Sequence, residues 1–157
     1  MALQRTALAV PGNTAVNTLG IGASASFDAV TVGASANVTD HEIQITALIG
    51  AITASASTLI NFYVFPSADG TNYTGGSATA DVVSATSAAF AMSANGTNGR
   101  YLGSILAHTA SITIKSPVFS LAAAVGSMPS KYVIVATNVT GVPLGSCTAA
   151  IQEIYYN

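Results

Sequence analysis

The scarcity of charged side chains constrains the fold of this chain more than any other feature. Only 6% of its 157 residues are charged, against roughly a quarter in ordinary soluble domains. A surface helix normally presents a charged or polar face to water, and Glu, Lys, Arg and Gln are too scarce here to supply one. Half of the residues are hydrophobic, and they are spaced among Ser, Thr, Gly and Asn. This mixture favours short strands and many turns.

The length suits one domain with a core of its own. No linker divides the sequence, but residues 11–26 are rich in Gly, Ala, Asn and Ser and read as a loop. We therefore predict an N-terminal arm and loop over residues 1–26 and a single β-sandwich domain over residues 27–157. Met1–Val10 is expected to be an arm or a first edge strand.

Two segments, Thr58–Phe65 and Lys131–Thr137, have the strongest strand patterns, because both are rich in aromatic and β-branched residues. Pro66 is expected to end the first of them. The other segments that we predict as strands are 27–32, 42–49, 100–106, 111–115, 117–121 and 148–156. Turn signals separate them at short intervals, with no helical crossover of the length that a parallel sheet requires. The prediction is an all-β fold, an antiparallel β-sandwich or jelly roll of roughly eight strands.

The two histidines are the first candidates for chemistry. His41 lies between Asp40 and Glu42, where it could supply half of a metal site or a base held by a carboxylate. No second His or Cys lies at ligand spacing, so we interpret His41 as a solvated residue at the entry to a strand. His108 is expected in a loop, and no serine lies in a Gly-x-Ser-x-Gly elbow. We therefore predict no catalytic, metal-binding or cofactor-binding residues, and a protein that is not an enzyme.

Three other motifs favour structural interpretations. Residues 20–25 fit a loose Gly-x-Gly-x-x-Ala pattern, but a nucleotide site needs a preceding strand and a following helix, and a strand is expected to follow here. Asp69-Gly70 could contribute to a calcium loop, but the pair alone predicts a turn. Cys147, the single cysteine, is expected to be a small apolar residue in a strand.

Neither nucleic acid nor a membrane is an expected partner. The four basic residues, Arg5, Arg100, Lys115 and Lys131, form no cluster, and phosphate binding requires clustered positive charge. Residues 43–68 carry no charge, yet the polar side chains among them fit strands better than a lipid-facing helix. The apolar run near the N-terminus is too short for a signal peptide, so we expect a protein that stays in the cytoplasm until assembly.

Several segments resemble sequences of small structural proteins from tailed bacteriophages. Phe62–Tyr73 is similar to an aromatic strand that runs into a Ser-x-Asp-Gly-x-x-Tyr turn in those proteins, and the likeness extends from Leu59 to the C-terminus. The later segments that carry it are 100–105, 119–132 and 135–141. The resemblance implies a component of the phage particle, and it assigns no functional residues.

The expected function is that of a capsid decoration, or cement, protein that stabilises the phage head. Its expected partners are the major capsid protein and further copies of itself, as a homo-oligomer and specifically a trimer, located in the virion. Met1–Val10 is expected to reach a neighbouring subunit. The alternative is a tail, neck or fibre component that binds a host glycan. Tyrosines could stack on sugar rings in that case, although the chain has no Trp; the candidates are Tyr63, Tyr73, Tyr155 and Tyr156.

Overall fold

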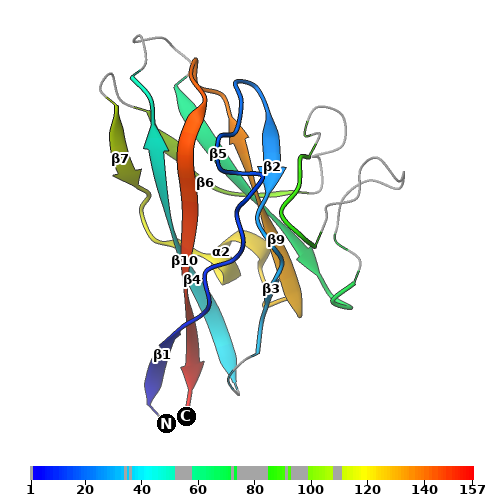
Figure 1. The fold of residues 1–157 in the computed structure, drawn as a ribbon. Coiled ribbons are helices and arrows are strands. Elements are labelled where there is room, and N and C mark those ends of the chain that lie inside the picture. The colour runs from blue at the N-terminus through cyan, green and yellow to red at the C-terminus, as the bar shows by residue number, and fades with distance from the viewer. Residues whose placement is uncertain are drawn as a thin grey trace.

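The fold is all-β, as predicted, and consists of two antiparallel sheets (Figure 1). The computed structural model describes residues 2–33, 35, 37–51, 58–71, 73, 85–90, 92, 99–107 and 111–157. Its elements are β1 (Leu3–Ala7), β2 (Ser24–Ser26), β3 (Val30–Thr31), β4 (Val38–Ile49), β5 (Leu59–Ser67), β6 (Arg100–Leu106), β7 (Ile112–Lys115), β8 (Phe119–Ser120), α2 (Leu121–Val125), β9 (Lys131–Asn138) and β10 (Leu144–Tyr156).

The strands form two five-stranded sheets. In sheet A the order is β1-β10-β4-β7, and β8 also pairs with β4; in sheet B it is β2-β9-β5-β6, and β3 also pairs with β9. The segment 1–26, predicted as arm and loop, thus contributes β1 to sheet A and β2 to sheet B. The two ends of the chain lie side by side at one end of the molecule (Figure 1), where Ala2 and Asn157 exchange two backbone hydrogen bonds of 3.2 Å.

The main core lies between the sheets and follows from alternation along the strands. Ile43, Ile45 and Ala47 of β4 are fully buried, while the intervening side chains face away from the core, as the period of two predicted. Sheet B also has a second cluster on its outer face. It packs Phe65 against Phe90, with ring centroids 5.3 Å apart. Around Val133 and Val135 sheet B is therefore apolar on both faces, which explains the continuous apolar run of β9.

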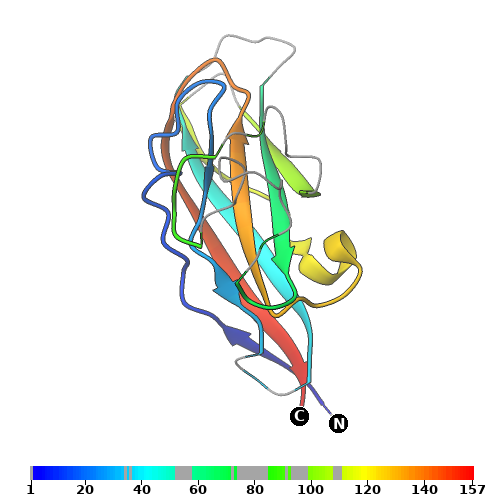
Figure 2. The same cartoon turned by 90° about the vertical axis from the view of Figure 1, so that its right-hand side faces the viewer.

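Several predicted boundaries were wrong. The segment 27–32 contributes only β3, and β4 and β10 begin earlier than predicted, at Val38 and Leu144. Two further errors have clear physical causes. Pro66 does not end β5, because Pro66 and Ser67 still pair with β9. A proline is tolerated there because pairing with β6 has already ended at Val64, so no ladder bond is required on that side. The segment 117–121 is not one strand: β8 covers two residues, and α2 then begins where the Ser120 hydroxyl accepts a 3.0 Å hydrogen bond from the Ala123 N–H. α2 lies beside the strands (Figure 2).

Candidate functional site

His41 lies on the core side of sheet A, not at a solvated strand entry. β4 begins at Val38, so His41 is inside the strand and shares the face of Ile43, and its side chain is fully buried. The interpretation of His41 as a solvated residue was therefore wrong. The same alternation in the sequence, continued two residues back from Ile43, would have placed this side chain in the core.

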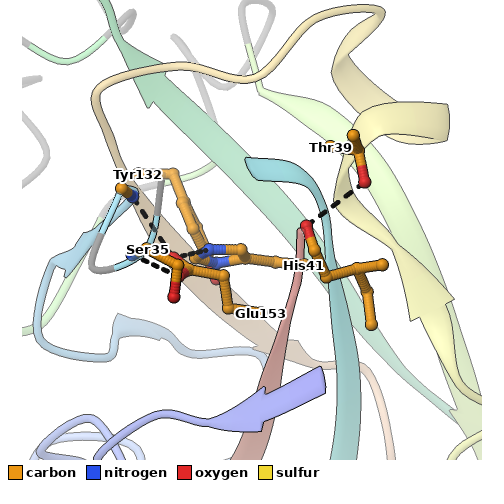
Figure 3. A network of polar contacts seen from close by, with 7 residues as sticks. Ser35, Thr39, His41, Tyr132 and Glu153 are labelled. Atoms are coloured by element: carbon orange, nitrogen blue, oxygen red, sulfur yellow. Dashed lines mark hydrogen bonds and ion pairs between the residues drawn. The ribbon is translucent and has the colours of Figure 1, made fainter. Parts of the chain in front are cut away.

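Glu153 is the direct neighbour of His41 on β10, and its carboxylate is enclosed as well. Its Oε2 lies 3.1 Å from His41 Nε2 and accepts a 3.2 Å hydrogen bond from the Gly33 N–H. Its Oε1 accepts a 2.7 Å hydrogen bond from the Ser35 N–H. The carboxylate therefore ties the chain between β3 and β4 to the end of sheet A (Figure 3).

Tyr132 brings sheet B into the same cluster. It lies on β9 with its side chain fully buried, and its hydroxyl lies 2.9 Å from His41 Nδ1. The two rings meet edge to face, with centroids 5.5 Å apart. We call His41, Tyr132 and Glu153 the buried relay; it links β4, β9 and β10 (Figure 3).

The protonation states of the buried relay follow from its surroundings. Burial lowers the pKa of His41, and this effect exceeds the opposing attraction of Glu153. Burial alone would raise the pKa of Glu153, but hydrogen bonds from Ser35, His41 and Gly33 outweigh it and lower the pKa. Burial raises the pKa of Tyr132 well above its ordinary value of 10.0. At neutral pH the Tyr132 O–H therefore donates to Nδ1 of a neutral His41, whose Nε2–H donates to an ionised Glu153.

A tyrosine, an imidazole and a carboxylate in series can transfer a proton in principle, but this series is closed to solvent. All three side chains are fully buried, so a substrate has no path to them in this conformation. A surface cleft of about 350 Å³ lies elsewhere, between the end of β5 and the turn before β9. It is lined by Pro66, Ala68, Val125, Ser127, Met128, Pro129 and Ser130.

The acidic neighbours of His41 have separate structural contacts. Asp40 Oδ1 accepts a 2.9 Å hydrogen bond from the Ala122 N–H in the first turn of α2. Glu42 pairs with Arg5 across the surface, with 3.2 Å between Oε1 and a guanidinium nitrogen. The carboxylate that holds His41 is thus Glu153, which is remote in sequence.

The other sequence candidates have the structural roles that were predicted for them, where the structure describes them. Cys147 is buried in the core of β10, and burial raises the pKa of its thiol to about 12. Asp69 organises a turn, because its Oδ1 accepts hydrogen bonds from the Thr71 N–H and the Ser67 hydroxyl. The strand expected after residues 20–25 is reduced to β3, and β2, which was not predicted, overlaps the end of the Gly-x-Gly-x-x-Ala match itself. His108 lies outside the described residues.

A second buried polar cluster, which the sequence analysis missed, surrounds Asn138 at the other end of β9. Its side-chain amide is fully buried and donates to the carbonyl oxygens of three residues at 2.9–3.2 Å. Its Oδ1 accepts 3.0 and 2.7 Å hydrogen bonds from the N–H and hydroxyl of Thr140. The carbonyls belong to Leu19, Gly20 and Val142. We call Asn138 with these partners the amide cluster.

The outer face of sheet B also has an uncharged part. Leu106, Leu59 and Val139 form one row across β6, β5 and the end of β9, with 66%, 36% and 40% of their surface exposed. The next rows have small polar side chains and then the edge-to-face pair of Tyr63 and Tyr101, with centroids 5.7 Å apart. We call this surface the neutral face; it consists of Leu59, Asn61, Tyr63, Tyr101, Ser104, Leu106, Thr137 and Val139.

The described residues contain no group of three or more His, Cys, Asp or Glu placed to hold a metal ion. Nor does any helix in the described part of the chain have the length and apolar character needed to cross a membrane.

Comparisons with protein-family models, with curated proteins and with solved structures found no match to this chain.

Proposed function

We propose that this chain is a non-enzymatic structural subunit of a bacteriophage particle, and specifically a decoration protein that stabilises the phage head. The composition of the neutral face is the main support for this proposal. A row of exposed Leu and Val followed by Ser, Asn, Thr and Tyr suits a broad contact with another protein, because the centres of protein interfaces are poor in charge and rich in aromatic residues. The major capsid protein is the proposed partner, and the virion the proposed location.

Two further features support a structural role. The titratable groups of the buried relay are enclosed by protein, so their contacts stabilise the fold and none of these three groups is accessible to a substrate. The four basic residues lie on four different strands, β1, β6, β7 and β9, which offers no continuous basic surface for nucleic acid. The resemblance to small tailed-phage proteins directs this general role towards the phage particle; location on the head and self-association as a trimer belong to the same proposal.

The test is co-sedimentation of the purified protein with phage heads that lack it. Leu106→Glu should weaken binding at least about tenfold, because docking buries a leucine side chain worth about 1.5–3 kcal/mol and each 1.4 kcal/mol is about tenfold in affinity. Val118→Glu is the matched control, since Val118 is 57% exposed and lies outside the neutral face. Equal binding of both variants would contradict docking through the neutral face, and failure of the unchanged protein to bind heads would contradict the decoration role.

The second candidate is a tail, neck or fibre component that binds a host glycan. The pair of Tyr63 and Tyr101 favours it, because Tyr101 is 56% exposed and offers an aromatic ring to a sugar. Tyr73, also a sequence candidate, is buried, and Tyr156 is 40% exposed. Binding of the protein to host cells, lost in Tyr101→Ala and kept in Tyr156→Ala, would support this candidate over decoration.

A further inference from the structure

Strand β1 is attached to the rest of the molecule along one edge only. All five of its residues are exposed, so neither of its faces contributes to the core. Among the described strands it pairs with β10 alone, from Leu3 opposite Tyr156 to Ala7 opposite Gln152. Its attachment therefore consists almost entirely of backbone hydrogen bonds at the surface, which are among the first to open in a folded protein.

The side-chain contacts of β1 add little to this attachment. Arg5 forms a 3.2 Å ion pair with Glu42, but their side chains are 55% and 32% exposed, and such surface pairs contribute little. Thr6 Oγ1 forms a 3.3 Å hydrogen bond with the Tyr155 hydroxyl, also at the surface.

The chain is fixed to the sandwich again at Pro11 and Gly12. Pro11 is buried, and the Gly12 carbonyl accepts a 2.8 Å hydrogen bond from the Asp28 N–H. A Cβ at position 12 would overlap the Asp28 carboxylate, which accepts a 2.6 Å hydrogen bond from the Ser87 N–H and would have to move. A cleft of about 320 Å³ beside this anchor is lined by residues 8–12 and 28–31. Between β1 and this anchor, Leu8 donates a 2.9 Å backbone hydrogen bond to the Ile151 carbonyl, and its half-buried side chain packs against the main core. The segment 2–10 is thus held by backbone hydrogen bonds to β10 and by this one apolar side chain.

We infer that residues 2–10 exchange between copies of this chain: β1 leaves its own β10 and pairs with residues 152–156 of β10 in a second copy. The register identifies β1 of another copy as the segment that fits the free edge of β10. The edge that β1 vacates is complementary to β1, and every copy carries both, so a closed exchange, between two copies or around a trimer, preserves the backbone hydrogen bonds and the Arg5–Glu42 pair. An empty β10 edge would otherwise be an open strand edge, which proteins avoid. This inference does not depend on the proposed function.

Single cysteines at paired positions can detect the exchange. Ala2 and Asn157 exchange both of their backbone hydrogen bonds, so their neighbours Leu3 and Tyr156 form a non-hydrogen-bonded pair, with Cα atoms about 4.5 Å apart. That separation permits a disulfide. Both residues are exposed, whereas Cys147 is buried and its raised pKa keeps it unreactive.

The experiment mixes Leu3→Cys protein with Tyr156→Cys protein under mild oxidation and separates the products on a non-reducing gel. The expected result is a disulfide-linked heterodimer, several-fold above the yield from Leu3→Cys mixed with Thr148→Cys, since Thr148 is exposed on β10 but does not face β1. The double variant Leu3→Cys/Tyr156→Cys, in one chain and dilute, should close within the chain and confirm the register. Closure of the double variant, with no heterodimer above the control at high concentration, would overturn the inference.

Discussion

The buried relay and the amide cluster lie near opposite ends of β9. Each fixes a loop to the sandwich, the first through titratable groups and the second through a neutral amide. The buried relay uses an ionised carboxylate and two titratable rings to hold the loop at Gly33 and Ser35. The amide cluster uses one neutral side chain to hold the loop at Leu19 and Gly20. No buried side-chain N or O atom of the described residues lacks a hydrogen-bond partner. Equal satisfaction of hydrogen bonds therefore does not give equal sensitivity to pH, since only one cluster can change its charge.

The largest effect is expected from breaking the buried relay at Glu153. Glu153→Leu should lower the free energy of unfolding by about 3–5 kcal/mol, because it leaves the fully buried His41 Nε2–H without an acceptor and removes the acceptor of the Gly33 and Ser35 N–H groups. Chemical denaturation measures the change. Glu153→Gln is the control: it keeps an acceptor oxygen and should lose less, and equal losses for both would show that charge, not hydrogen bonding, dominates.

The amide cluster should be the less costly to break. Asn138→Ala removes the donor to three carbonyls and the acceptor for Thr140, so the free energy of unfolding should fall by about 2–3 kcal/mol. This loss should be the same at every pH between 5 and 8, because no group of the cluster titrates there. A loss that varied with pH over that range would contradict the claim that only the buried relay is sensitive to pH.

Acid should weaken the protein through the buried relay. The pKa of His41 is lower in the folded chain than its ordinary value of 6.5, so the unfolded chain takes up the proton first and stability falls as pH drops below 6.5. Glu153, whose pKa is lowered from 4.5, adds a further loss as pH falls below 4.5. Each group contributes at most about 1.4 kcal/mol per pH unit. Between pH 7 and pH 4 the midpoint temperature of thermal unfolding should fall less in His41→Gln than in Asn138→Ala, because only Asn138→Ala retains the buried relay.

The smallest effect is expected from Tyr132→Phe, which removes one hydroxyl and its 2.9 Å contact with His41. The free energy of unfolding should fall by about 1–2 kcal/mol at pH 7. Because the pKa of Tyr132 is raised in the folded state, the unfolded chain ionises first above pH 10, and stability falls there. Between pH 9 and pH 11 the free energy of unfolding, measured by denaturation, should therefore fall less in the variant than in the unchanged protein. An equal fall in both proteins would show that a group other than Tyr132 causes the sensitivity to alkali.

The strands were predictable where apolar and polar residues alternate along the sequence. β6 matches its predicted segment, and the core-facing residues of β4 follow the predicted alternation. β2 was missed because Ser24-Ala25-Ser26 carries no large apolar residue; its pairing with β9 decides the conformation. The helix α2 was missed because it is five residues long and depends on capping by Ser120.

The buried relay was only half predictable. His41 was recognised as a base that a carboxylate could hold, but its adjacent acids suggested a charged, solvated turn. The partner, Glu153, is 112 residues away in sequence, and only the pairing of β4 with β10 brings the two together. Glu153 shares the inward side of β10 with Ile151, so a carboxylate on an apolar face was a usable signal that a buried partner existed. The contribution of Tyr132 depends on how the sheets face each other, which local patterns do not specify.

The contact between Phe65 and Phe90 on the outer face of sheet B limits the places where a foreign peptide can be inserted into this protein. Surface segments between strands usually accept insertions, and residues 85–90 contain no regular strand that would warn against one. However, Phe90 covers Phe65 there, and the Ala88 carbonyl and the Phe90 N–H are hydrogen-bonded to β2. An insertion at this segment would uncover an apolar sheet face and invite aggregation. The turn at residues 69–71, which is exposed and closed by its own Asp69, is the better place to display a peptide.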